Sequence, residues 1–140
     1  MAGKNAEFAR SFQEQVNFFT KKVVPEARVL LMKKVGMEFY RRLTLKSPVD
    51  TGRFRANWGI DIGSPYEEQD ATLTAKDWAQ REMFAQLKID SFGVSDTQIW
   101  ICNNLPYSNR LEYGWSKQAP QGMVRTSLLE MKEWAQARRR

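Results

Sequence analysis

The sequence predicts an α+β domain, in which a long amino-terminal helix and further helices pack on a small antiparallel β-sheet. Apolar residues recur every three or four positions in the first third and at the end of the chain, which is typical of helices. Only two short segments have β character, too little strand for a doubly wound sheet. With 140 residues, no internal repeat and no long flexible linker, residues 1–140 are expected to form one domain.

The first third of the chain is expected to be a long helix, kinked or split near Pro25. Pro25 lacks a backbone donor, so it either kinks one helix or lies in the first turn of a second. Pro48 ends the helix near Lys46, because the residue before a proline is pushed out of the helical region. The expected buried face contains Phe8, Phe12, Val16, Phe19 and Val23, followed by Ala27, Leu30, Leu31, Val35 and Phe39.

Residues 53–62 predict a half-buried strand, because apolar and polar residues alternate. Its expected inward residues are Phe54, Ala56, Trp58, Ile60 and Ile62. A second strand is expected over residues 97–102, paired with the first. Between them, Thr74 followed by Asp77 predicts the capped start of a helix, which residues 90–93 end. The apolar residues expected on this helix are Trp78, Ala79, Met83 and Leu87.

The end of the chain predicts two more helices. Residues 107–113 are expected to form a short helix with Gly114 as its left-handed cap. The last helix is expected to share one face among Val124, Leu128, Met131 and Ala135.

Composition excludes several classes of site. The chain has no histidine and one cysteine, Cys102, which excludes a disulfide within the chain, a His/Cys zinc site and a histidine base. We expect no cofactor and no metal. No stretch has the signature of a signal peptide or a membrane span, so the protein is expected to be soluble and made in the cytoplasm.

Charge is segmented along the chain. Residues 1–55 hold 12 Lys or Arg against 5 Asp or Glu, residues 56–115 hold 4 against 9, and residues 116–140 hold 6 against 2. Oppositely charged blocks suit subunits that associate head to tail. For DNA binding, the candidates are Arg53 with Arg55 and the tail 138–140; the alternative interpretations are a solvated strand face and a frayed terminus.

The segment Ser47–Trp58 contains Asp50-Thr51-Gly52, which has two interpretations. It is the carboxylate turn of a dimeric aspartic protease, or a tight turn that leads into a strand. A protease needs two such turns whose carboxylates share one proton, and this chain has one copy, with cations following it. We favour the turn, in which Asp50 accepts hydrogen bonds from backbone N–H groups two residues on.

A second dense segment runs from Asn103 to Ser116 and into Arg125. Its aromatic and amide side chains suggest either a sugar- or base-stacking site with Glu112 as a catalytic acid, or a protein interface. No partner carboxylate is placed to act with Glu112, so we favour the interface.

Together these segments resemble the tail-component family of long-tailed bacteriophages. These are the gene-product-ten-like tail-completion, neck or head-to-tail joining proteins of lambdoid phages. The first motif, Pro-Val-Asp-Thr-Gly-Arg-Leu-Arg, is matched at Asp50, Thr51, Gly52, Arg53 and Arg55, with Pro48 before them and Trp58 downstream. The second is matched at Pro106, Tyr107, Leu111, Glu112 and Gly114, beside Tyr113 and Trp115. Two residues depart mildly from the patterns: Phe54 stands where leucine is common and Ser108 where alanine is common. Residues 64–92 are the least diagnostic.

The resemblance implies a non-enzymatic virion protein. Such a protein assembles as a homo-oligomeric ring, expected to be a hexamer, in the neck, where it completes the tail and joins it to the head. Implied partners are head-side adaptor or stopper proteins, a tail terminator or tail tube protein, and genomic DNA passing through the lumen. The alternatives are a tail terminator or other minor tail protein, a DNA-binding module and, remotely, a protease using Asp50. The matched residues are then turn and interface residues.

Overall fold

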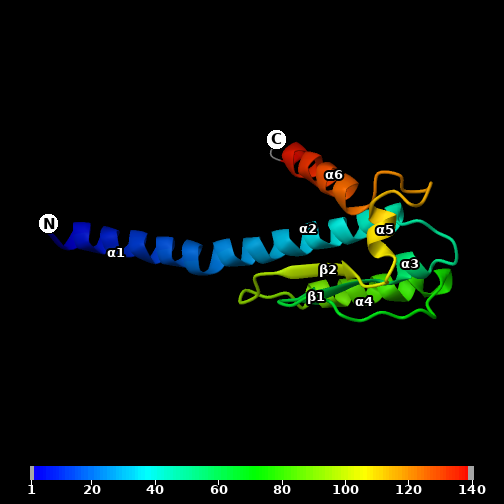
Figure 1. Ribbon diagram of the computed structural model, residues 1–140. Helices are drawn as coiled ribbons and strands as arrows, with labels where there is room; N and C mark the ends of the chain where they lie inside the picture. Colours follow the sequence, from blue (N-terminus) through cyan, green and yellow to red (C-terminus); the bar gives the residue numbers. More distant parts are fainter. Residues whose placement is uncertain (1, 139–140) are drawn as a thin grey trace.

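One long helix dominates the fold (Figure 1). The computed structural model describes residues 2–138, and no helix in this range is long and apolar enough to cross a membrane. Helix α1 (Ala2–Phe18), a π-helical turn (Phe19–Val23) and α2 (Val24–Lys46) follow one another without a break. Pro25 lies in the first turn of α2, the second of its two expected positions. The amide of Val24 donates to Phe19 O, the long bond that marks the π-turn.

The buried face of the long helix differs from the prediction. The residues of α2 that are buried are Val29, Gly36, Met37, Tyr40 and Leu43. The predicted stripe is largely uncovered, with Phe8 74% and Phe12 60% exposed. The helix has apolar residues on more than one face, and periodicity cannot tell which face the rest of the chain covers. Only α2 lies beside the body of the molecule (Figure 1).

The sheet has two antiparallel strands, as predicted. Strand β1 (Trp58–Ile62) pairs with β2 (Ile99–Asn103) in a register that sets Ile60 opposite Ile101. The first half of the predicted strand is instead the short helix α3 (Arg53–Ala56). Gly52 turns the chain left-handed and the amide of Ala56 donates to Gly52 O at 3.0 Å, which closes a helical turn before the strand begins.

Helix α4 (Trp78–Asp90) connects the strands. The predicted cap is confirmed: a 3₁₀ turn (Ala75–Asp77) precedes α4, and the amide of Thr74 donates to the Asp77 carboxylate at 2.8 Å. Its buried residues are Ala85 and Ile89, whereas the predicted Met83 and Leu87 are exposed. The predicted helix is confirmed, but its predicted buried face is wrong, because the apolar residues of α4 also lie on two sides.

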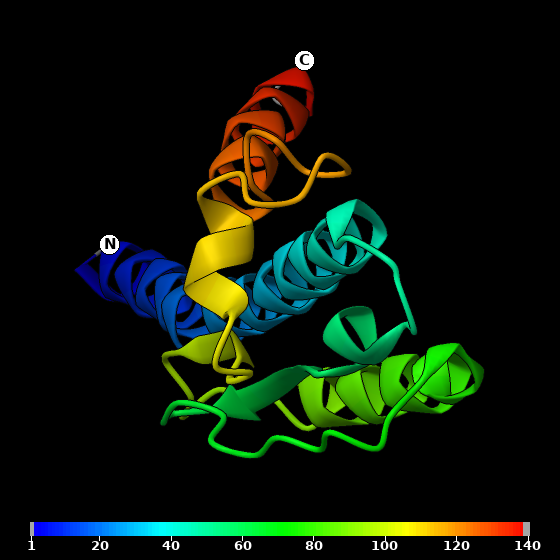
Figure 2. The ribbon, with the colours of Figure 1, turned by 45° about the vertical axis from the view of Figure 1, so that its right-hand side comes forward.

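The remaining helices are α5 (Ser108–Glu112) and α6 (Val124–Ala137). In α6 the prediction holds for Met131, which is buried, and fails for Leu128, which is exposed. Helix α2 lies between α6 and the sheet in both views (Figures 1 and 2). One core joins these elements, and its buried members are Met37, Tyr40, Leu43, Phe54, Trp58, Ile60, Ala85, Ile89, Leu105, Ala119 and Met123.

Close packing at Gly36 fixes α2 against the body. A Cβ at this position would lie 3.2 Å from Ile99 Cδ1 and 3.3 Å from Ile89 Cδ1. We expect Gly36→Leu to lower the free energy of unfolding by about 1–3 kcal/mol, because a larger side chain must separate α2 from β2 and α4. Urea unfolding measures this. Gly3→Leu is the matched control, since Gly3 has open space around it; equal losses at both positions would contradict the packing described.

Candidate functional site

The Ser47–Trp58 motif is built around the end of α2. Ser47 leaves the helical conformation, and its hydroxyl donates to Leu43 O at 2.7 Å. The same oxygen accepts the indole N–H of Trp58 at 2.7 Å. Trp58 is 5% exposed, so the tryptophan of the motif belongs to the core. Pro48 is also buried, and the motif therefore ties the helix end to the first strand.

The turn depends on the backbone conformation of Gly52. Its φ of 88° lies in the left-handed region that favours glycine. A Cβ at Gly52 would also lie 2.5 Å from the backbone nitrogen of Ala75. That nitrogen donates to Thr51 O at 3.1 Å, which holds the turn to the segment before α4. The glycine is required both by the backbone angle and by this close approach.

The prediction that Asp50 anchors the backbone of the turn is wrong. Asp50 is exposed, and within residues 2–138 its carboxylate has no hydrogen-bond or ion-pair partner. The hydroxyl of Thr51 takes that role instead, accepting the amide of Arg53 at 3.3 Å. Asp50 projects from the turn without a structural partner.

The two motif arginines follow within α3 and are half-buried. The Arg55 guanidinium lies 4.3 Å from the ring centre of Trp78 and donates to Leu45 O at 3.3 Å. Burial lowers the pKa of this guanidinium. The interpretation of the pair as a solvated strand face is wrong, because α3 is helical; DNA binding by these arginines stays a prediction. Arg55 packs on α4, whereas Arg53 lines a groove described below. Of the basic tail, Arg138 stacks 4.0 Å from Trp134, and residues 139–140 lie outside the described residues.

The second motif forms α5 and the loop that follows. Gly114 has a φ of 89°, which confirms the left-handed cap. Tyr107 and Leu111 are half-buried and pack against the core, and Pro106 is exposed. Tyr107, just before α5, and Leu111, within it, therefore join this segment to the core.

Glu112 caps helix α6. Its carboxylate accepts the amides of Met123, Val124 and Arg125 at 2.8, 2.9 and 3.1 Å. The Arg125 guanidinium adds a bond to the same carboxylate at 3.2 Å. A negative charge at a helix amino terminus satisfies amides that have no partner within the helix and complements its dipole.

The charge state of Glu112 follows from these contacts. Burial disfavours the carboxylate, but three backbone N–H groups and Arg125 outweigh it, so the pKa of Glu112 lies below its usual range. Glu112 is therefore an ionised structural acceptor. A general acid needs the opposite shift, which weighs against the sugar-site interpretation.

The structure brings the two motifs together in one junction. The rings of Phe54 and Tyr107 are 6.0 Å apart, and the Asn103 amide donates to Phe54 O at 2.8 Å. Val49 and Gln118 exchange a pair of bonds, with the Val49 amide donating to Gln118 Oε1 at 2.8 Å and Gln118 Nε2 donating to Val49 O at 2.9 Å. Between the segments lies an open groove of about 370 Å³. It is lined by residues of both, among them Asp50, Thr51, Arg53, Phe54, Tyr107, Leu111 and Gln118.

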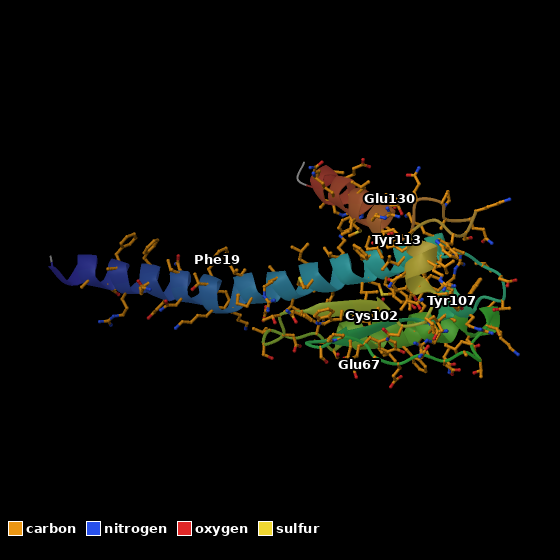
Figure 3. All side chains as sticks on the ribbon, in the orientation of Figure 1. Phe19, Glu67, Cys102, Tyr107, Tyr113 and Glu130 are labelled. Atoms are coloured by element: carbon orange, nitrogen blue, oxygen red, sulfur yellow. The ribbon has the colours of Figure 1, made fainter. Side chains whose placement is uncertain are left out.

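Aromatic residues near the junction face solvent. Tyr113 is 71% and Trp115 73% exposed. Arg125 lies 5.0 Å from the Tyr113 ring centre, and Arg110 lies 5.0 Å from that of Trp115. Figure 3 shows Tyr113 and Tyr107 both near α5, below the start of α6. Aromatic and arginine side chains of this kind are enriched at protein interfaces.

Sequence reasoning missed the roles of Glu112 and Gln118. A signal for Glu112 was present: α6 begins after Met123, which has no capping side chain, so its first amides need an acceptor from elsewhere. Gln118 gave no signal, since a glutamine that pairs with a distant backbone resembles any loop glutamine. Among residues 2–138, no group of three or more His, Cys, Asp or Glu is placed to hold a metal ion.

Comparisons of the chain with protein-family models, with curated proteins and with solved structures found no match.

Proposed function

We propose that this chain is a structural protein of a tailed-bacteriophage virion, forming a ring in the neck that completes the tail and joins it to the head. The observation that carries the proposal is the junction: the two motifs that resemble the tail-component family lie together, Phe54 against Tyr107. Their charged residues serve contacts between elements, with Glu112 capping α6 and Arg55 stacked on Trp78. This use of motif residues suits an assembly protein.

The exposed apolar surface also supports an assembly role. Large apolar side chains are exposed to solvent along α1, on the outer side of α4 and beside the junction. Extended apolar surface on a soluble chain marks contacts with other molecules. In a neck ring, each subunit contacts two neighbours through different patches, and the genome passes through the lumen.

The protease alternative has less support. Asp50 is exposed and without partners in the described residues, whereas shared-proton catalysis needs two carboxylates held close together.

A tail terminator or other minor tail protein is the nearer alternative, since its size and architecture are similar. Deletion of the gene separates these roles: phage lacking this chain are expected to accumulate assembled heads and tails of normal length that are not joined. Tails of irregular length would favour a terminator, and normal joined particles would overturn both.

Asp50→Ala tests the junction as a contact site. Because Asp50 has no partner within the described chain, we expect the free energy of unfolding to change by less than about 0.5 kcal/mol. We expect the yield of joined particles to fall, since the carboxylate faces outward beside the groove. Thermal unfolding of the protein and plaque counts from the mutant phage measure the two effects. A normal yield of infectious particles would contradict a contact through Asp50.

A further inference from the structure

The first half of the long helix has no partner within its own chain. We call residues 2–23, comprising α1 and the π-turn, the stem. No described side chain of the stem is buried. No other element lies beside it (Figures 1 and 3). Its stripe of apolar side chains at helical spacing is exposed throughout and consists of Phe8, Phe12, Val16, Phe19 and Val23.

A helix of this kind needs a surface to cover it. Isolated helices are marginal in water, and most helical stability in proteins comes from packing of the apolar face. The stem continues into α2 without a break, and Figure 1 shows it pointing away from the body. It therefore cannot fold back on its own chain while the helix stays intact. The cover must come from another molecule.

The outer side of α4 offers a matching surface. Met83, Phe84 and Leu87 lie there and are 53%, 46% and 60% exposed. We call these three residues the α4 face. An open groove of about 500 Å³ adjoins it, with Phe84 in one wall and Glu67 and Glu68 among its lining residues.

The charges around that groove favour a basic occupant. Its own cations are already engaged: Lys88 lies 3.2 Å from the Asp61 carboxylate, and Arg81 donates to Tyr66 Oη at 2.7 Å and to Ala56 O. Glu67 and Glu68 are exposed and form no ion pair within residues 2–138. Two acidic side chains thus stand beside an apolar face.

The stem carries the complementary pattern. Lys22, three residues after Phe19 and next to Val23, lies beside the apolar stripe, 5.8 Å from the Phe18 ring centre, whereas Lys21 lies on the opposite side of the helix. Within the described residues, neither lysine has an ion-pair partner. Pairing of two stems in parallel register would bring these lysines together, which opposes a parallel stem–stem contact. Packing on the α4 face joins opposite charges.

We propose that the stem of one copy packs along the α4 face of a second copy, with Lys22 facing Glu67 and Glu68. The contact joins two different patches, so successive copies form a closed ring or an open filament. This inference adds a specific contact to the proposed ring, and only the closure of the ring rests on the proposed function. The contact between two copies is testable with purified protein alone.

Charge reversal and its rescue test the contact in the full-length chain. Sedimentation velocity and light scattering of the wild-type protein are expected to show association. Lys21→Glu/Lys22→Glu and Glu67→Lys/Glu68→Lys should each weaken it at least tenfold. All four changes in one chain should restore it, because every contact again pairs opposite charges. Lys34→Glu/Lys132→Glu changes the net charge equally at exposed sites and should have no such effect.

Apolar variants give a second test. Phe12→Ser in the stem and Leu87→Ser on the α4 face should each weaken association, with unchanged circular dichroism showing intact folding. A monomeric wild-type protein, or stem variants without effect, would overturn the proposal. Weakening by stem variants without rescue in the fourfold variant would also overturn it, since the stem would then pack elsewhere. Absence of the chain from virions, with this association intact, would overturn only the proposed function.

Discussion

Replacing Gly52 by alanine is expected to lower the free energy of unfolding by roughly 3 kcal/mol. A left-handed residue other than glycine costs about 1–2 kcal/mol. The added Cβ would also lie 2.5 Å from the nitrogen of Ala75, a backbone atom that cannot move without losing its bond to Thr51. The turn, α3 and the start of α4 would shift together. Denaturant unfolding of the variant measures the loss.

Gly63 provides the matched control for this prediction. Its φ of 82° is similar, but a Cβ there would meet no atom within 4 Å. Gly63→Ala should therefore carry only the backbone cost, about 1–2 kcal/mol. Equal losses at the two glycines would show that the contact between the turn and Ala75 contributes nothing, and the description of the motif as a structural joint would fail.

Glu112→Ala should destabilise the protein by about 2 kcal/mol. The substitution removes the acceptor for the first amides of α6, and losing a helix cap costs up to about 2 kcal/mol. It also removes the ion pair with Arg125. Thermal unfolding should show a fall of roughly 6–10 °C in Tm for a chain of this size. Glu133→Ala, an exposed position on the same helix, is the control and should change Tm little.

The pH dependence of stability tests whether the ionised Glu112 carboxylate stabilises the folded protein. The pKa of Glu112 is lowered in the folded protein, so the folded state favours the ionised form. Its contribution is fully present above the usual glutamate pKa of about 4.5 and is lost as the pH falls through the lower folded value. The stability difference between wild type and Glu112→Gln should therefore shrink below about pH 4.5. A difference that grows with acidity would contradict the role of the carboxylate as a cap.

Local signals were enough to predict most of the elements. Pro48 ends the long helix, Thr74 with Asp77 caps the turn before α4, and Gly114 adopts the left-handed conformation. Each of these effects is set by the residue and its near neighbours. The antiparallel pairing of the two strands was also predicted, because only two β-rich segments exist to pair.

The failures lie where the outcome depends on distant parts of the chain. The alternation at residues 53–56 resembles a strand, but the turn at Gly52 and its contact with Ala75 set a helical turn instead. The covered faces of α2 and α4 depend on what packs beside them. The role of Glu112 depends on amides 11 to 13 residues away, and Asp50 lacks the partner that a local rule assigned to it.

We propose that this chain is a ring-forming component of the phage neck. Electron microscopy of intact virions, with density assigned to this chain by its long helix, tests it most directly. The account predicts a ring of copies between the head and the tail tube, in which the stem of each subunit contacts its neighbour. Virions whose neck contains no density for the chain, or contains it only as isolated copies, would contradict the account.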